Sequence, residues 1–278
     1  MKFLTPFSSF WRHIAGLLLS LASFASFTVV AGPVDCGDRP ISIAFFDFGF
    51  LYFEQDGQGR GIDKDFVDEL AKRTGCKFST QTMPRARVWA DLATGELDMS
   101  LSGVQSPERD RFAWFAPYSY FKNFALVRTS TAATVSSAED FMAQGQLQFG
   151  VVRGFVHQPA QEKWLEQLRS TQRVQESASI SILFEKLKLG RIDGLFALPV
   201  VYRKILQEMK MQDEVVIRDW TPKDKASLGC LVMAKSRFSE AEAVRWRNVV
   251  RAMRTDGTLE KIYARYLSPA EARAGVDF

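Results

Sequence analysis

The sequence predicts an α/β fold in which parallel strands are covered by helices on both faces. Short apolar runs alternate along the chain with longer segments that carry an apolar stripe at helical spacing. The connector from a helix into a strand also occurs twice, as Thr94-Gly-Glu-Leu-Asp98 and as Leu189-Gly-Arg-Ile-Asp193. A connector that is used twice in one chain indicates two similar lobes.

In the first half, the helical and strand patterns follow one another closely. A strand at 41–46 leads into an aromatic loop at 46–53 and a glycine-rich turn at 56–61. A helix is expected at 63–74, ended by Gly75, because a glycine just past the last turn commonly ends a helix. The remaining elements expected here are a strand at 77–80, a helix at 86–93 and a strand at 97–101.

A second unit begins near Arg128 with a polar stretch at 129–137. After a short helix, the expected elements are a strand at 147–152, helices at 158–168 and 179–189, a strand at 192–197, further elements at 201–210 and 215–217, a strand at 228–233, and helices at 240–254 and 259–266.

The amino-terminal segment predicts export. Lys2 and Arg12 flank a start without acidic residues, residues 14–30 are almost wholly apolar or small, and Val29-Val30-Ala31 offers small residues for cleavage. We therefore expect residues 1–31 to be a cleaved signal peptide and the mature chain to be periplasmic. A retained membrane anchor is the alternative, since the apolar run approaches the length that spans a bilayer.

Composition limits what the mature chain can bind. Roughly 245 residues can form one large domain or two lobes. Loss of Lys2 and Arg12 lowers the formal net charge from +4 to +2, which is too mild to indicate nucleic acid or a membrane surface. Because His157 is the one histidine left and no Cys or His pair has metal spacing, we expect no metal, cofactor or histidine-based catalysis. No sustained apolar seam beyond the core faces is visible, so we expect a monomer.

The three cysteines predict one disulfide and one buried thiol. Cys36 lies just before the strand at 41–46, and Cys76 lies just before the strand at 77–80. If these strands are adjacent and parallel, both cysteines fall at the same sheet edge, where a bridge can form. Cys230 lies within an apolar strand, which is typical of a buried free thiol. Three unpaired thiols are the alternative.

A set of motifs runs in a fixed order through nearly all of the mature chain. They are Gly61-Ile-Asp-Lys-Asp65, Leu92-Ala-Thr-Gly-Glu-Leu-Asp98, Ser106-Pro-Glu-Arg109, Phe115-Ala-Pro-Tyr118, Val152-Arg-Gly154, Leu189-Gly-Arg-Ile-Asp193 and Arg254-Thr-Asp-Gly-Thr-Leu-Glu-Lys-Ile-Tyr263. With this set the chain resembles the family-3 extracellular solute-binding proteins, the periplasmic receptors that supply polar amino acids to ABC importers. The resemblance implies a two-lobed, type II periplasmic-binding-protein fold that closes about a two-strand hinge. Lobe 1 would comprise 32–126 and 229–278, and lobe 2 would comprise 127–228.

The resemblance places Arg109 where the family's arginine pairs with the ligand carboxylate. A planar guanidinium suits this role because it can donate two parallel bonds to one carboxylate. Backbone amides near Ser102, Gly103 and Ser106 would complete the anion site. The alternative is a surface Arg109 paired with Glu108 or Asp110.

Two departures from the family pattern concern the rest of the ligand. Leu198 stands where amino-acid-binding members place an aspartate for the ligand ammonium, so Asp47 is the candidate replacement, unless it only caps a local turn. Arg85 stands where an aromatic side chain is common; it could hold a second anionic group or stack on an aromatic ring, or it could be a solvated arginine at a helix start. Other expected lining residues are Phe46, Phe48, Tyr52, Gly154 and Phe155. These departures favour a carboxylate with an apolar or aromatic body, or a dianion, over a standard polar amino acid.

Three functional classes follow. The expected one is a receptor, not an enzyme, that captures a small carboxylate (an amino acid or related organic acid) for the permease of an ABC importer. A receptor for a signalling partner would need the same closure, so the sequence does not separate the two. An enzyme like the cyclohexadienyl dehydratases, which resemble this family, would need a cleft carboxylate as general acid or base, and Asp47 and Glu108 are the only candidates.

Overall fold

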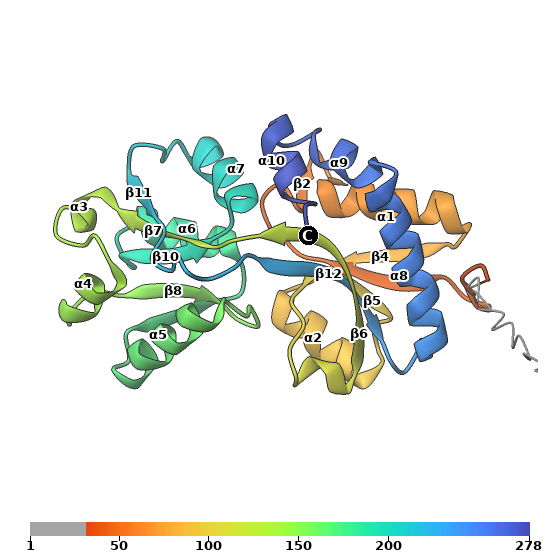
Figure 1. The fold of residues 1–278 in the computed structure, drawn as a ribbon. Helices are drawn as coiled ribbons and strands as arrows, with labels where there is room; N and C mark the ends of the chain where they lie inside the picture. Colours follow the sequence, from red (N-terminus) through yellow and green to blue (C-terminus); the bar gives the residue numbers. More distant parts are fainter. Residues whose placement is uncertain (1–31) are drawn as a thin grey trace, which may run out of the picture. The chain divides into compact units, whose positions relative to one another are not determined.

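The structure, a computed structural model, describes residues 32–278. The expected signal peptide at 1–31 lies outside these residues. Within 32–278, no helix is both long enough and apolar enough to cross a membrane. The described chain folds into two five-stranded sheets, each flanked by helices, and one small hairpin (Figure 1).

The first sheet joins residues from both ends of the described chain. Its strands in spatial order are β4 (Phe78–Thr82), β1 (Ile41–Phe45), β5 (Met99–Gly103), β12 (Ser227–Ala234) and β6 (Ala113–Phe121). The helices that accompany it are α1 (Ile62–Thr74), α2 (Arg85–Thr94), a 3₁₀ turn (Arg109–Arg111), α8 (Glu240–Thr255), α9 (Thr258–Tyr263) and α10 (Pro269–Ala274). The hairpin of β2 (Phe53–Gln55) and β3 (Gln58–Arg60) precedes α1.

The second sheet is built from the middle of the chain. Its strands in spatial order are β11 (Val215–Arg218), β7 (Phe124–Arg128), β10 (Gly194–Ala197), β8 (Phe149–Val152) and β9 (Val174–Ser177). Its helices are α3 (Thr129–Ala132), α4 (Ala138–Ala143), α5 (Pro159–Ser170), α6 (Ile180–Lys188) and α7 (Pro199–Met209).

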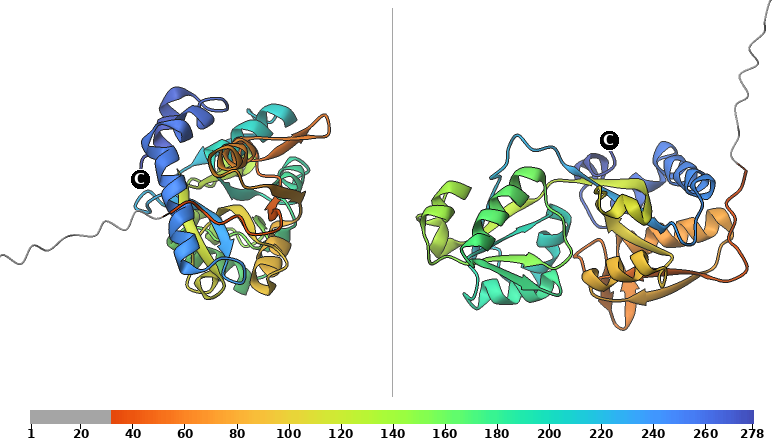
Figure 2. Two further views of the ribbon diagram at one scale, coloured as in Figure 1. Left: turned by 90° about the vertical axis from the view of Figure 1, so that its right-hand side faces the viewer. Right: turned by 90° about the horizontal axis from the view of Figure 1, so that it is seen from below.

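The chain passes between the sheets twice. It leaves the first sheet after β6 and returns from β11 to β12, and Figures 1 and 2 show these two connections running side by side. The pairing of Phe121 with Ser227 in one sheet and of Ala125 with Arg218 in the other agrees with this. β7, which holds the expected lobe boundary at 126/127, lies wholly in the second sheet.

The parallel strands predicted from the sequence make up part of each sheet, and the rest is antiparallel. β4, β1 and β5 are parallel, as are β10, β8 and β9. β12 and β6 pair antiparallel in the first sheet, and so do β7 and β11 in the second. The reason is that these four strands carry the chain out of one sheet and back again, so each runs against its neighbour.

The predicted disulfide is confirmed, and the strands that place it pair as expected. β1 and β4 are parallel neighbours, with Ile41 beside Phe78. Cys36 and Cys76 precede these two strands and are bonded, with 5.3 Å between their Cα atoms. Cys230, within β12, is a buried free thiol. The helix predicted before Gly75 also ends there, with Gly75 in the left-handed region at φ 74°.

Candidate ligand-binding site

Arg109 lies in the 3₁₀ turn that follows β5, and its side chain is buried. Nη1 donates to the carbonyl oxygen of Val104 at 2.7 Å, and Nη2 donates to that of Gly154 at 2.9 Å. The guanidinium carbon also lies 3.6 Å from the centre of the Trp89 ring. Val104 follows a strand of the first sheet and Gly154 follows β8 of the second, so Arg109 joins the two lobes.

The alternative of a surface ion pair does not describe Arg109. Glu108 pairs instead with Arg111, at 3.9 Å, and Asp110 accepts a bond from Gln105. Within residues 32–278, Arg109 forms no ion pair with an acid. Burial lowers the pKa of Arg109 to about 10, so the group stays charged at neutral pH.

Arg85 is the first residue of α2 and is buried to a greater extent, with 2% of its surface exposed. Nη2 donates to the carbonyl oxygen of Ser102 at 2.9 Å. Nε and Nη1 are buried and have no hydrogen-bond partner in the described part of the chain. Burial, and then the charge of Arg109, lower the pKa of Arg85 to about 9. The solvated arginine that the sequence left open as an alternative is therefore not found.

Three phenylalanine rings surround the Arg85 guanidinium. Its central carbon lies 4.5 Å from the ring centre of Phe46, 4.9 Å from that of Phe155 and 5.4 Å from that of Phe48. Phe46 and Phe48 come from the loop after β1, whereas Phe155 follows β8. We call these three residues the ring cage. Because their negative ring faces meet a positive charge, they stabilise it without supplying a counter-ion.

Ser102, Asp63 and Tyr118 form a buried polar cluster that the sequence did not predict. The Ser102 hydroxyl donates to Asp63 at 2.9 Å, and the Tyr118 hydroxyl donates to the same carboxylate at 2.5 Å. The Ser102 N–H in turn donates to the Tyr118 oxygen at 2.9 Å. Ser102 has φ 50°, a left-handed conformation that is uncommon outside glycine and that clusters at functional sites. The cluster therefore fixes the position of the Ser102 carbonyl group, which accepts the hydrogen bond from Arg85.

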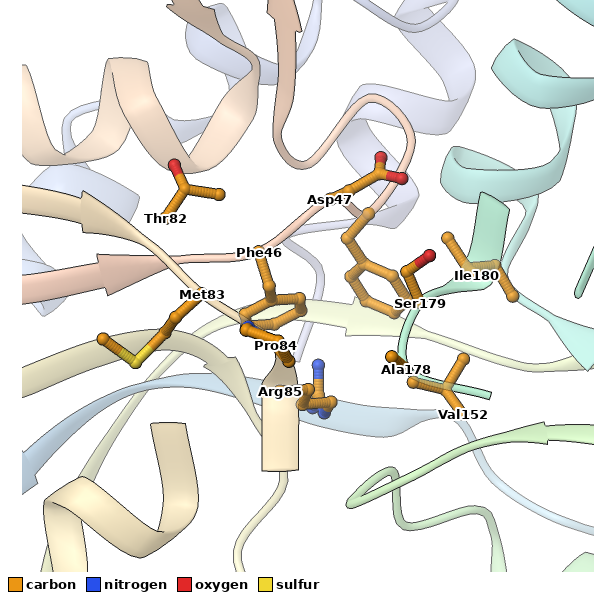
Figure 3. Close-up of a pocket in the computed structure, with 11 residues that line it drawn as sticks. Phe46, Asp47, Thr82, Met83, Pro84, Arg85, Val152, Ala178, Ser179 and Ile180 are labelled. Carbon is orange, nitrogen blue, oxygen red and sulfur yellow. The ribbon is translucent and has the colours of Figure 1, made fainter. Parts of the chain in front are cut away.

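A cavity of about 260 Å³ opens beside Arg85. Figure 3 shows its lining by residues of both lobes, which are Phe46, Asp47, Phe48, Thr82, Met83, Pro84, Arg85, Val152, Ala178, Ser179 and Ile180. Most of these side chains are apolar, and Arg85 and Asp47 carry the charges. Arg109 is not part of this lining.

Two smaller cavities adjoin the ring cage, of about 30 Å³ and 10 Å³. Phe48, Phe155, Leu198 and Asn123 line both, and Ser102 lines the larger of the two. Leu198, expected from the resemblance to stand at the ligand's ammonium site, lines both cavities with an apolar side chain. Asn123, which lines the same two cavities, has a buried Oδ1 without a partner among residues 32–278.

The other expected site residues lie in varied surroundings. Gly103 has no room for a side chain, since a Cβ atom would lie 2.3 Å from Val232. The Ser106 oxygen accepts the Arg109 N–H at 3.4 Å and so supports the 3₁₀ turn. Tyr52 stacks on Phe45 and contacts Thr82 through its hydroxyl, outside all the cavities described above. Gly154 has φ 78°, and a Cβ atom there would approach the Ala86 backbone within 3.2 Å.

The fold and this site define a two-lobed binding protein whose lobes meet at a cleft. The same conclusion follows from the sequence as a whole. A sequence model of the bacterial extracellular solute-binding proteins, family 3, matches residues 43–269, and the chain belongs to this family.

Relatives with named ligands resemble this chain at low sequence identity. A probable histidine-binding protein of Neisseria gonorrhoeae is 21% identical over 227 residues, which cover 81% of each chain. The L-cystine-binding protein TcyJ of Escherichia coli strain K12 is 24% identical over 224 residues, or 77% of this chain and 76% of that one. A solved structure of an ancestral arginine-binding protein bound to arginine superposes with a TM-score of 0.70 at 20% identity, covering 82% of this chain and 98% of that one.

Proposed function

We propose that this chain is an exported receptor that captures a small carboxylic acid, an amino acid or a related organic acid, for the permease of an ABC importer. The supporting observation is the pair of buried guanidinium groups of Arg85 and Arg109 between the lobes. Neither forms a direct ion pair with an acid among residues 32–278, although the buried Asp63 acts electrostatically on Arg85. A buried cation without an ion pair is unfavourable, and a carboxylate supplies the opposite charge as well as acceptors for Nε and Nη1 of Arg85, which have none in the described chain.

The walls of the cleft favour an acid with an apolar or aromatic body. Phe46, Val152 and Ile180 line the larger cavity, and Leu198 lines the smaller ones. Asp47 is the acid in the lining of the larger cavity, and it serves as acceptor for an ammonium group where the ligand has one. An α-amino acid with an apolar side chain has the carboxylate, the apolar body and the ammonium group that these residues would bind.

The acidic side chains at the cleft favour a binding protein over an enzyme. Asp47 already accepts a hydrogen bond from Ser181, and Glu108 is exposed. Asp63, the buried carboxylate, is held by Ser102 and Tyr118 and lines none of the cavities described. We therefore expect no aromatic product when the protein is incubated with prephenate or arogenate.

The disulfide supports a location outside the cytoplasm. A bond such as that between Cys36 and Cys76 persists in the oxidising periplasm and is rare in reducing compartments. Together with the expected signal peptide at 1–31, it favours a periplasmic receptor.

A thermal-shift screen of the mature protein tests the proposal. Ligands that bind only the folded state raise the melting temperature by mass action. We expect apolar amino acids or aromatic carboxylates to raise it and their amides to do so far less. A protein that responds to none of these acids would not be a carboxylate receptor. Loss of uptake of the same acid in cells that lack the gene would then identify the importer role.

A further inference from the structure

Asn123 lies in the connection between β6 and β7, one of the two crossings between the lobes, and it is 3% exposed. Its backbone carbonyl group accepts a hydrogen bond from Nε2 of Gln161, in α5, at 3.3 Å, which holds the residue in place. The side-chain oxygen, Oδ1, is buried and has no partner among residues 32–278. Because a buried acceptor normally has a donor, this oxygen indicates a donor from outside the chain, either a water molecule or a ligand.

The 30 Å³ cavity beside Asn123 also adjoins both guanidinium groups of the cleft. Ser102 and Val104 line this cavity. Their carbonyl groups accept hydrogen bonds from Arg85 and Arg109, respectively. A carboxylate held by these arginines therefore brings the carbon atom next to it, and the substituent on that carbon, close to Asn123. The space suits a group of about the size of one water molecule, and not a ring.

The two arginines give this end of the cleft its positive charge. Nη1 and Nη2 of Arg109 each donate to one carbonyl group, and each carries a second N–H for a further acceptor. Arg85 keeps Nε and Nη1. The buried Asp63 acts electrostatically on Arg85, but it is bonded to Ser102 and Tyr118 and lines neither of the smaller cavities. Asp63 thus offsets part of the charge of Arg85 without offering an acceptor to a ligand.

No acidic side chain of the described residues lines either of the smaller cavities. The titratable side chain in their lining is His157, whose pKa is lowered mainly by burial, so that it is uncharged at neutral pH. Asp47 lines the larger cavity and neither of the smaller two. An ammonium group beside Asn123 would face two guanidinium groups with no acid to accept it. A neutral group meets no such repulsion.

A hydroxyl group is the neutral substituent that best matches an amide side chain. It can donate to Oδ1 of Asn123, and it can also accept from the amide nitrogen of the same side chain. An ammonium group can only donate. The remaining walls of the cavity include Phe48, Phe155 and Leu198, which offer no hydrogen bond in competition.

We propose that Asn123 receives a hydroxyl group on the carbon next to the carboxylate of the ligand, so that the favoured ligand is a 2-hydroxy acid with an apolar or aromatic body. The guanidinium groups hold the carboxylate, and Asn123 selects the substituent beside it. The ammonium group of an amino acid uses Asp47, so the two substituents have different acceptors. This inference rests on the proposed function, since it names the kind of acid that the cleft captures.

Acids that differ only in this substituent test the role of Asn123. One set is 3-phenylpropanoate, both enantiomers of 3-phenyllactate, and L-phenylalanine. The aliphatic set is 4-methylpentanoate, both enantiomers of 2-hydroxy-4-methylpentanoate, and L-leucine. Each is titrated by calorimetry into the wild-type, Asn123→Leu and Asn248→Leu proteins. Asn248, in α8, lines none of the cavities described and provides the matched control.

We expect one enantiomer of a hydroxy acid to bind the wild-type protein about tenfold or more tightly than the acid without the hydroxyl group, because a buried acceptor then gains its donor. This ratio should fall to within about twofold in Asn123→Leu and stay unchanged in Asn248→Leu. A ratio that persists in Asn123→Leu overturns the inference. Equal binding of both acids by the wild-type protein also overturns it, and then a water molecule is the donor to Oδ1. If the wild-type protein binds none of the acids, the proposed function fails instead.

Melting temperatures show whether the variants fold. Leucine replaces an unpaired buried oxygen with an apolar group of similar size, so Asn123→Leu should melt no lower than the wild-type protein in the absence of ligand. If it does not fold, Asn123→Asp keeps the shape of the side chain and places an acid at the cavity. The amino acid should then gain about tenfold in affinity relative to the hydroxy acid. An unchanged order of affinities in Asn123→Asp contradicts the inference.

Discussion

The hydroxyl of Ser181, in the first turn of α6, donates a hydrogen bond to Oδ2 of Asp47, in the loop after β1. The bond joins the two lobes at the rim of the larger cavity, since Asp47 follows a strand of the first sheet and α6 packs on the second. Oδ1 of Asp47 accepts no hydrogen bond from residues 32–278. Asp47 therefore contributes to closure and retains an acceptor for a ligand.

Replacement of Asp47 by Asn should weaken the binding of amino acids selectively. If Asp47 accepts an ammonium group, the affinity for L-phenylalanine falls about tenfold or more in Asp47→Asn, because a charge-assisted hydrogen bond is lost. The affinity for 3-phenylpropanoate, which lacks the ammonium group, should change by less than about threefold. Calorimetric titration of both probes measures the difference.

Ser181→Ala is the matched control for this change. It removes the contact between the lobes and leaves the Asp47 charge in place, so both probes should lose affinity by the same factor. An equal loss for both probes in Asp47→Asn would assign Asp47 to closure alone.

Cationic amino acids should be rejected, in contrast to what the names of several structural neighbours state for those proteins. The Arg85 guanidinium already occupies the ring cage, and a second cation in the cleft would meet the charges of both Arg85 and Arg109. L-Arginine and L-lysine should therefore leave the melting temperature of the wild-type protein unchanged at millimolar concentration.

The Arg85→Ala variant should behave in the opposite way. It leaves three phenylalanine rings around a vacated space, which is a favourable site for a guanidinium group. L-Arginine should then raise the melting temperature of this variant more than L-leucine does. A wild-type protein that responds to L-arginine would show that the Arg85 charge does not determine selectivity.

The parts of the fold that the sequence predicted depend on local patterns. α1 follows from the apolar stripe that buries Phe66, Val67 and Leu70, and its end follows from Gly75. The disulfide was predictable because Cys36 and Cys76 stand at equivalent positions before neighbouring parallel strands. In each case the decisive residues are close in sequence or follow from simple sheet geometry.

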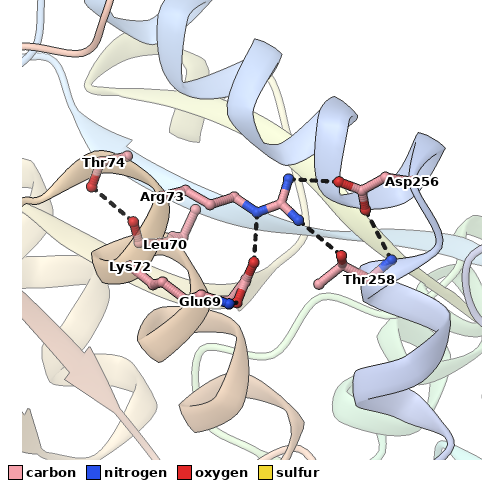
Figure 4. Close-up of polar contacts among 7 residues, drawn as sticks. All are labelled: Glu69, Leu70, Lys72, Arg73, Thr74, Asp256 and Thr258. Atoms are coloured by element: carbon pink, nitrogen blue, oxygen red, sulfur yellow. Dashed lines mark hydrogen bonds and ion pairs between the residues drawn. The ribbon is translucent and has the colours of Figure 1, made fainter.

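The parts that the sequence did not predict depend on contacts between distant residues. Figure 4 shows Arg73 of α1 bonded to Asp256 at 2.8 Å and to Thr258 at 2.8 Å, some 185 residues along the chain. Asp63 is 39 residues from Ser102 and 55 from Tyr118, and no pattern within α1 reveals that this acid is buried. The burial of Arg85 likewise depends on Phe155, which belongs to the other lobe.

The buried Asp63 predicts a pH-dependent contribution to stability. Burial raises the pKa of Asp63 to about 7, despite the opposing hydrogen bonds from Tyr118 and Ser102 and the charge of Arg85. Between about pH 4 and pH 7 the folded protein keeps this proton and the unfolded chain does not. The contribution of Asp63 is thus greatest at low pH and falls as the pH rises toward 7.

Comparison with Asp63→Asn isolates this effect. The free energy of unfolding of the wild-type protein, relative to the variant, should fall between pH 4 and pH 7 by roughly 2 to 4 kcal/mol. His157, whose pKa is lowered mainly by burial, contributes with the opposite sign but is common to both proteins and cancels in the difference. Urea titrations of both proteins at four pH values measure the difference in their free energies of unfolding. A difference that does not change with pH would show that Asp63 is ionised throughout this range.

The disulfide and the free thiol should respond differently to reagents. Cys36 and Cys76 close a loop of 40 residues, and the chain-entropy model assigns about 4 kcal/mol to such a loop. The Cys36→Ser/Cys76→Ser protein should therefore unfold at lower urea concentration, by a free energy of about 2 to 4 kcal/mol. Reduction of the wild-type protein should produce the same loss.

Cys230 should be inert until the protein unfolds. It is 1% exposed within β12, and burial raises its pKa to about 12, so almost none of it is the reactive thiolate at pH 8. Iodoacetamide should modify no cysteine of the native protein, one after denaturation, and three after denaturation with reduction. Rapid modification of Cys230 in the native protein would mean that β12, which returns the chain to the first sheet, opens readily. Because Cys230 pairs with Gly103 and Pro117 on the two neighbouring strands, such opening would also disrupt the strand end that carries Ser102 and, through it, Arg85.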